Sequence, residues 1–152
     1  MKIETFKDLI DWTRQLHAHL AECFGHCASQ HEEDLGKWLL EYLAAHEATL
    51  ERTVASSEKQ ADPKALHTRV YDYLSHNPIT PHQACSAPYA EMSFEDICRE
   101  VFSLHDQVID LYRYLDGRAE IPEARELVRE LLKLEEHEAM RLAHQSNRAR
   151  DL

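Results

Sequence analysis

Two stretches of this chain repeat each other, and the repeat limits the possible fold more than any other feature of the sequence. Thr5 opens the run Thr-Phe-Lys-Asp-Leu, and Ser93 opens the similar run Ser-Phe-Glu-Asp-Ile 88 residues later. A Leu-His pair follows each run at the same distance, so His17 and His105 occupy equivalent positions. We therefore expect a fold built from two copies of one structural unit.

A second match lies further along each copy. The pattern Leu-x-x-Leu-x-x-His-Glu-Ala occurs in residues 40–48 and again in residues 131–139. These stretches include polar residues at matched positions of otherwise apolar faces. With the first match, they predict that the repeated unit is a pair of helices.

Four long segments have the periodicity of amphipathic helices. Apolar residues recur every three or four positions within residues 6–28, 32–57, 94–116 and 122–147. Short links join the first segment to the second and the third to the fourth, which is typical of antiparallel helical hairpins. The chain has only three glycines and five prolines, so few residues interrupt helices. The predicted fold class is all-α.

Candidate caps mark the ends of these segments. Thr5 with Asp8 resembles a capping box, and Ser29 with Glu32 suits the start of the second segment. Gly117 suits the end of the third.

The link between the two hairpins is long. Asp62-Pro63 predicts the start of a short extra helix, and His76-Asn77-Pro78 predicts its end. A helix of about 25 residues is about 37 Å long, a distance that this link can cross. We therefore predict a single domain, residues 1–152, with an up-down-down-up bundle. Its parts are hairpin one (about 5–57), the crossover (about 58–92) and hairpin two (about 93–148).

Charge and hydropathy exclude several partners. The net charge of -11 disfavours nucleic acids and anionic membranes, and no apolar run approaches the length of a membrane helix. The N-terminal residues contain acids and no apolar signal core, so we expect a cytoplasmic protein. The cysteines are then expected to be thiols: Cys23, Cys27, Cys85 and Cys98.

The chain has eleven histidines, and their positions divide them into two groups. Seven fall on polar faces or in links and are expected to be solvated: His19, His26, His31, His67, His76, His82 and His144. The other four are related by the repeat. His17 and His105 border apolar stripes, whereas His46 and His137 flank glutamates that lie within such stripes.

Those glutamates are Glu47 and Glu138, and each long helix thus points one His or one Glu inward near its midpoint. A buried carboxylate must be paired, protonated or bound to a metal ion. We predict a metal site formed by His17, Glu47, His105 and Glu138, with iron as the first candidate and manganese or zinc as alternatives. Glu135 lies near the same stripe and could join or replace Glu138.

A structural interpretation stands beside this one. Two hydrogen-bonded His–Glu pairs could form a polar layer that only sets the register of the helices. The function would then lie in a helical interaction module, for example a homodimer, with Trp12 or Trp38 as contacts.

The duplicated hairpin, the long crossover and the inward His and Glu residues resemble the ferritin-like superfamily, which includes rubrerythrin-type and other di-iron carboxylate bundles. That pattern has a Glu on helices one and three and Glu-x-x-His on helices two and four. Here His17 and His105 stand at the single-glutamate positions. Leu50 and Arg141 stand where the histidines of the Glu-x-x-His pairs would be. The resemblance thus implies a fold and a site position more than a reaction. If the site is catalytic, it implies redox or oxygen chemistry at a mononuclear or dinuclear centre.

Overall fold

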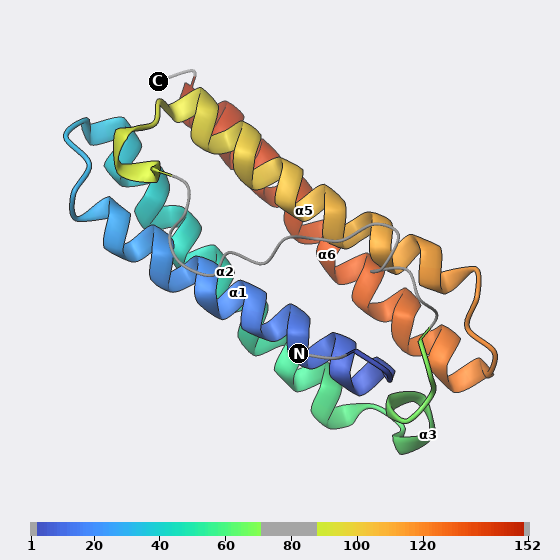
Figure 1. Cartoon of the computed structure of the whole chain (residues 1–152). Helices are drawn as coiled ribbons and strands as arrows, with labels where there is room; N and C mark the ends of the chain where they lie inside the picture. Colours follow the sequence, from blue (N-terminus) through green and yellow to red (C-terminus); the bar gives the residue numbers. More distant parts are fainter. Residues whose placement is uncertain (1–2, 71–87, 151–152) are drawn as a thin grey trace.

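The computed structural model of the chain describes residues 3–70 and 88–150. Four long helices dominate it, and two short ones lie in the crossover (Figure 1). The long helices are α1 (Phe6–Ala28), α2 (Asp34–Gln60), α5 (Phe94–Asp116) and α6 (Pro122–Arg150). The short ones are α3 (Pro63–Leu66) and the 3-10 turn η1 (Tyr89–Glu91). No β-strand occurs in the described part of the chain, which confirms the all-α prediction.

The repeat is visible in how helices α1 and α5 begin. Both helices have 23 residues, and both start at a phenylalanine that follows a hydroxyl-bearing N-cap. The Thr5 side chain accepts a hydrogen bond from the Asp8 amide, and the Ser93 side chain accepts one from the Asp96 amide. The Asp8 side chain in turn accepts from the Thr5 amide, which completes the predicted capping box. Helix α5 ends at Asp116 with Gly117 as its C-cap, also as predicted.

The predicted cap of α2 is wrong. The helix begins at Asp34, and Glu33 is its N-cap without any side-chain hydrogen bond to the helix. Ser29 instead closes α1, where its hydroxyl donates to the carbonyl oxygen of His26 at 2.7 Å. Ser29 fails as a cap of α2 because it still lies within the last turn of the preceding helix.

The described ends of the crossover lie at opposite ends of the bundle (Figure 1). Its start lies beside the N-terminus, where the Phe6 amide donates to the carbonyl oxygen of Thr68 at 2.9 Å. The short helix α3 begins at Pro63, as predicted, and ends at Leu66. The prediction that this helix continues to residues 76–78 is therefore wrong, although those three residues themselves lie outside the described part of the chain.

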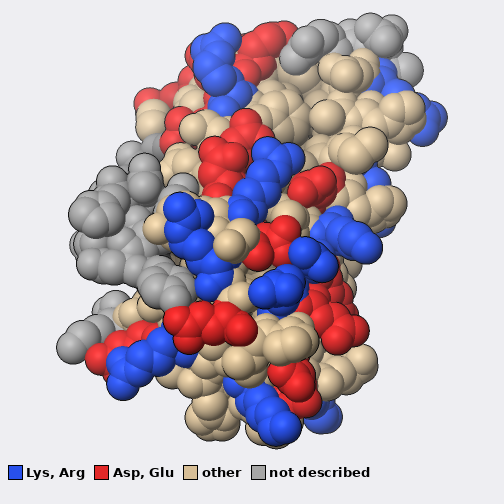
Figure 2. Space-filling view, turned by 90° about the vertical axis from the view of Figure 1, so that its right-hand side faces the viewer, with Lys and Arg blue, Asp and Glu red and all other residues tan. Residues whose placement is uncertain are grey.

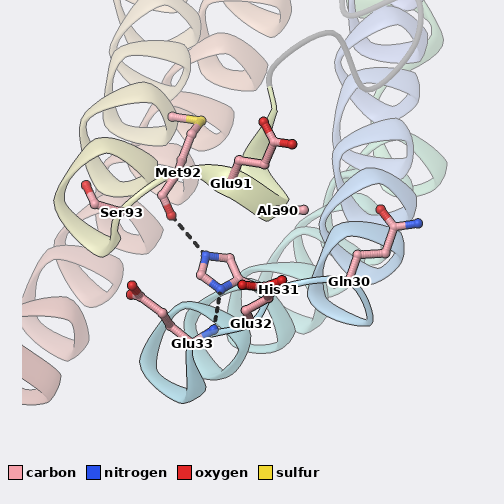
Figure 3. A pocket seen from close by; sticks show the side chains of 8 residues that line it. All are labelled: Gln30, His31, Glu32, Glu33, Ala90, Glu91, Met92 and Ser93. Atoms are coloured by element: carbon pink, nitrogen blue, oxygen red, sulfur yellow. Dashed lines mark hydrogen bonds between the residues drawn. The ribbon is translucent and has the colours of Figure 1, made fainter.

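The far end of the crossover lies beside the connection between α1 and α2. There His31 Nε2 donates to the carbonyl oxygen of Met92, while His31 Nδ1 accepts from the Glu33 amide (Figure 3). His31 is therefore half-buried and hydrogen-bonded, not simply solvated as predicted. Because the two described ends of the crossover lie at opposite ends of the bundle, α5 runs parallel to α2 in the up-down-down-up order, as Figure 1 shows.

The core is formed by the apolar stripes of the four long helices. Leu9, Leu20 and Phe24 of α1 pack with Leu40 and Leu43 of α2 in one cluster that also includes the stripes of α5 and α6. On the face shown in Figure 2, basic and acidic side chains are interspersed and do not gather into patches of one sign. None of the described helices is both long and apolar enough to span a bilayer.

The cysteines differ from the prediction at one position. Cys27 and Cys98 are buried thiols, as expected. Cys23 is disulfide-bonded, which corrects the expectation that every cysteine is a thiol. Cys85 lies outside the described residues.

Candidate metal centre

A buried polar cluster lies between the helices at mid-bundle, and His17 with Glu47 forms its centre. The two side chains are 1% and 0% exposed. His17 Nδ1 donates to Glu47 Oε2 at 2.6 Å. Each residue belongs to the buried stripe of its helix, so packing α1 on α2 brings the two side chains together.

The second hairpin reaches this cluster through His105 of α5. His105 Nε2 donates to Glu47 Oε1 at 2.5 Å, and the side chain is 2% exposed. The rings of His17 and His105 meet edge to face, with centroids 6.1 Å apart. Glu47 therefore holds one histidine of each repeat, one with each carboxylate oxygen.

Helix α6 contributes Glu135 to the cluster. His17 Nε2 donates to Glu135 Oε1 at 2.8 Å, and both side chains are 1% exposed. Glu138 lies beside the cluster instead: its carboxylate is 3.6 Å from His46 Nδ1 and 3.5 Å from the Arg141 guanidinium. The structure thus brings together three of the four predicted ligands, with Glu135 as the fourth member of the cluster.

Glu135 lies in the cluster in place of Glu138 because of the register of α6. Its buried positions follow one helical stripe: Ala124, Leu127, Val128, Leu131, Glu135, Leu142, Ser146 and Ala149. The matched pattern in residues 40–48 and 131–139 selects Glu138 as the partner of Glu47, but the stripe passes through the residue three positions earlier. A full count of the apolar positions on α6 would have favoured Glu135.

The two flanking histidines, His46 and His137, have different environments. His46 is 9% exposed, and its ring stacks on that of His105 with centroids 5.9 Å apart. His137 is exposed on the surface of α6 and takes no part in the cluster. The register of α6 explains this, because His137 follows the buried Glu135 by two residues and so lies on roughly the opposite face of the helix.

A smaller polar pair also joins the two hairpins. The hydroxyl groups of Thr13 and Tyr112 are 2.8 Å apart, and Thr13 also donates to the carbonyl oxygen of Leu9 at 3.0 Å. Thr13 and Tyr112 are both fully buried. Thr13 lies one turn before His17 on α1, so this contact joins α1 to α5 directly beside the cluster.

The charges of the cluster reinforce one another. Burial alone would lower the pKa of His17, but the nearby carboxylates of Glu135 and Glu47 raise it to about 10. Burial likewise opposes ionisation of Glu47, yet the two histidines hold its pKa well below the ordinary value. Glu47 also raises the pKa of His105 against the effect of burial. At neutral pH the raised pKa of His17 and the lowered pKa of Glu47 therefore favour an imidazolium cation beside a carboxylate anion.

The donor set suits a first-row transition metal. Three buried atoms have no hydrogen-bond partner: His105 Nδ1 and Glu135 Oε2 within the cluster, and His46 Nε2 beside it. Imidazole nitrogens and carboxylate oxygens are the donors that iron, manganese and zinc accept in proteins. Within residues 3–70 and 88–150, however, no group of three or more His, Cys, Asp or Glu side chains is arranged to hold an ion as it stands. Their donor atoms hydrogen-bond to one another instead.

Comparison with known proteins supports the fold. No family model and no curated protein matches the sequence. A solved structure from Thermotoga maritima, of a candidate ferritin-like diiron-carboxylate protein, superposes with a TM-score of 0.59 at 12% sequence identity. The alignment covers 97% of this chain and 98% of that one, so the similarity extends over both whole bundles. The chain therefore has the ferritin-like fold, with two αα-hairpins joined by a long crossover.

Proposed function

We propose that the protein binds a transition metal ion, with iron as the first candidate, at the cluster of His17, Glu47, His105 and Glu135. The observation that carries this proposal is the set of three partnerless donor atoms among fully buried imidazoles and carboxylates. Glu138 and His46 lie next to the cluster and are the further candidate ligands. Manganese and zinc suit the same donors.

Metal binding here would replace shared protons. His17 contacts a carboxylate through each ring nitrogen, and these carboxylates raise its pKa to about 10, so the doubly protonated form is favoured at neutral pH. A metal ion needs neutral imidazole, and its binding must release these protons and let the side chains rotate toward the ion. The affinity would therefore rise with pH.

The proposed chemistry is redox or oxygen chemistry. Carboxylate and imidazole ligands leave coordination positions open for water or oxygen, and a ferritin-like bundle places them away from solvent. The structural similarity to a candidate diiron-carboxylate protein supports iron over the alternatives.

A second function has an observation of its own. His17 is satisfied at both nitrogens by Glu47 and Glu135 without any ion. In this alternative the network has no role beyond setting the register of the helices in an interaction module. A second copy of the chain is the partner this alternative would take.

Elemental analysis separates the two functions. The protein is produced without a histidine tag in medium supplied with iron, manganese and zinc, and bound metal is measured per chain. We expect stoichiometric metal in the wild type, loss in His17→Ala and Glu47→Ala, and retention in His137→Ala. His137→Ala is a matched control because that histidine is exposed and its substitution leaves the cluster intact.

A second measurement covers the case in which the variants fold poorly. Thermal unfolding of the metal-free wild type is recorded with and without added Fe²⁺, Mn²⁺ or Zn²⁺. A ligand that binds only the folded state must raise the melting temperature. An unchanged melting temperature, together with wild-type protein that contains no metal, would rule out the metal site. The polar cluster would then serve only to set the register of the helices.

A further inference from the structure

An apolar groove lies on the surface between the start of α2 and the end of α6. Its volume is about 270 Å³, and it is lined by Leu35, Trp38, Gln145, Arg148 and Ala149. Leu35 and Trp38 are 43% and 41% exposed, and they are two of the three large apolar side chains that are exposed in the described part of the chain. Large apolar side chains gathered at one surface site indicate a contact with another molecule.

The ring of Trp38 is held in place at the edge of this groove. It stacks on Tyr42, with centroids 5.6 Å apart and planes 17° apart, and Tyr42 itself is half-buried. A side chain that is already ordered loses little entropy when it is buried by a partner. Tryptophan is also enriched among the few residues that supply most of the binding energy of protein interfaces. The groove is smaller than the roughly 300–1,000 Å³ of small-molecule sites, so a protein side chain suits it better.

The two sides of the groove carry opposite charges at matched spacing. Asp34 and Glu41 lie seven residues apart on the exposed face of α2 that also bears the tryptophan. Arg141 and Arg148 lie seven residues apart on α6, and both are exposed. Residues 139–150 contain three arginines and no acidic residue. Among the described residues, none forms an ion pair with Asp34, Glu41 or Arg148.

This charge pattern favours a second copy of the chain as the partner. The net charge of -11 makes two copies repel each other in most orientations. Self-association therefore needs a surface on which basic side chains of one copy meet acidic side chains of the other. The groove is such a surface, because its basic side on α6 and its acidic side on α2 are two turns long each.

The heights of these charges along the bundle also match. His46 lies beside Glu138, and Leu35 shares the groove with Ala149, so α2 and α6 run antiparallel with one constant register. In this register Asp34 is level with residue 150 and Glu41 with residue 143. Each acid is therefore within two residues, or about 3 Å along the axis, of the height of one arginine.

We propose that this groove is the interface of a symmetric dimer whose two-fold axis runs parallel to α2 and α6. Such an axis places α2 of one copy over α6 of the other without changing heights. Asp34 then faces Arg148 of the second copy, and Glu41 faces Arg141 of the second copy. Trp38 of each copy enters the groove of the other. A two-fold axis across the helices would instead place α2 over α2, with acid against acid.

The dimer goes beyond the proposed metal site and does not depend on it. The groove is on the surface, and neither Trp38 nor the four charged residues belong to the buried cluster. Either proposal can therefore fail while the other stands.

The first test removes the ring of Trp38. Light scattering after size-exclusion chromatography measures the mass of the purified protein over a range of concentrations. One chain has a mass of 17.7 kDa, and we expect twice this value for the wild type. Trp38→Ala should raise the Kd of the dimer by about tenfold or more. Met140→Ala is the matched control: it removes an apolar side chain that is 71% exposed and does not line the groove, and it should leave the Kd unchanged.

The second test exchanges charges across the interface. Arg148→Glu places like charges opposite each other and should also raise the Kd by about tenfold. Combining it with Asp34→Arg restores opposite charges and should recover most of the affinity. Arg99→Glu on α5 makes the same change of charge at a side chain that is 77% exposed and should have no effect. Circular dichroism of each variant verifies that the helices are intact.

Three outcomes would overturn the proposal. A wild type that stays monomeric at every concentration would show that the groove does not bind a second copy. A dimer that keeps its Kd in both Trp38→Ala and Arg148→Glu would have its interface elsewhere. If Arg148→Glu weakened the dimer and the double variant did not recover it, the assigned two-fold axis would be wrong.

Discussion

Glu135 Oε1 accepts a hydrogen bond from His17 Nε2 at 2.8 Å, so a carboxylate of the last helix binds a histidine of the first. The same histidine holds Glu47 of α2 through its other nitrogen, and Glu47 holds His105 of α5. Four helices are thereby joined by three charge-assisted hydrogen bonds. Such bonds are stronger than neutral ones, and breaking one leaves a buried charge uncompensated.

The first prediction separates the two glutamates of α6. In metal-free protein, Glu135→Gln removes a buried charge partner of His17 and should lower the free energy of unfolding by roughly 3 kcal/mol. Glu138→Gln changes a carboxylate that is 17% exposed and should cost less than about 1 kcal/mol. Urea unfolding in the presence of a chelator measures both. Equal losses would contradict the placement of Glu135 in the cluster.

The second prediction concerns the stability of metal-free protein against pH. The pKa of His17 is raised from 6.5 to about 10, so its contribution is complete below pH 6.5 and is lost as the pH rises toward 10. The pKa of Glu47 is lowered from 4.5, so its contribution is complete above pH 4.5 and is lost as the pH falls below that value. These two groups should therefore stabilise the fold most between pH 4.5 and pH 6.5.

Urea midpoints from pH 4 to pH 10 test this dependence, and His17→Gln provides the comparison. The variant should lose most of the decline on the alkaline side because glutamine does not titrate. If the urea midpoints of wild type and variant fell in parallel above pH 6.5, the loss of stability at alkaline pH would arise from groups other than His17.

The third prediction concerns the hydroxyl pair that joins the hairpins near the cluster. Tyr112→Phe removes the bond to Thr13 while keeping the buried ring, and it should cost about 1 kcal/mol. Thr13→Val and the double variant complete a double-mutant cycle. A coupling energy near zero would show that the two hydroxyls make no net interaction.

The fourth prediction concerns the contact between the α1–α2 connection and the start of hairpin two. A Cβ atom added at Gly36 would lie only 2.2 Å from the ring of His31, so Gly36→Ala must displace that ring. The displaced ring would lose its bonds to Met92 and Glu33. We expect destabilisation of about 1–2 kcal/mol, measured by urea unfolding.

Gly25→Ala is the matched control for this variant. It is also a helical glycine, but its added Cβ would approach Ala44 only to 3.9 Å, an ordinary contact. Alanine has the higher helix propensity, so this change should be neutral or stabilising. Gly36→Ala behaving like Gly25→Ala would mean that the His31 bonds contribute nothing.

Much of the fold was predictable because helices depend on local pattern. The apolar periodicity predicted the four long helices, and Thr5, Asp8 and Gly117 marked helix ends correctly. The repeat and the long crossover predicted the up-down-down-up arrangement of the four helices. Ser29 misled because a capping residue looks the same in sequence whether it opens one helix or closes the one before.

The sequence by itself determined which polar residues must be buried, because His17, Glu47 and His105 occupy or border apolar stripes whatever the packing. Only the tertiary structure decided which of them meet. Rotation of α6 about its axis is set by contacts along its whole length, and this rotation turned Glu135 inward and left His137 on the surface. The stack of His46 on His105 likewise joins residues of two hairpins, and no spacing within either hairpin encodes it.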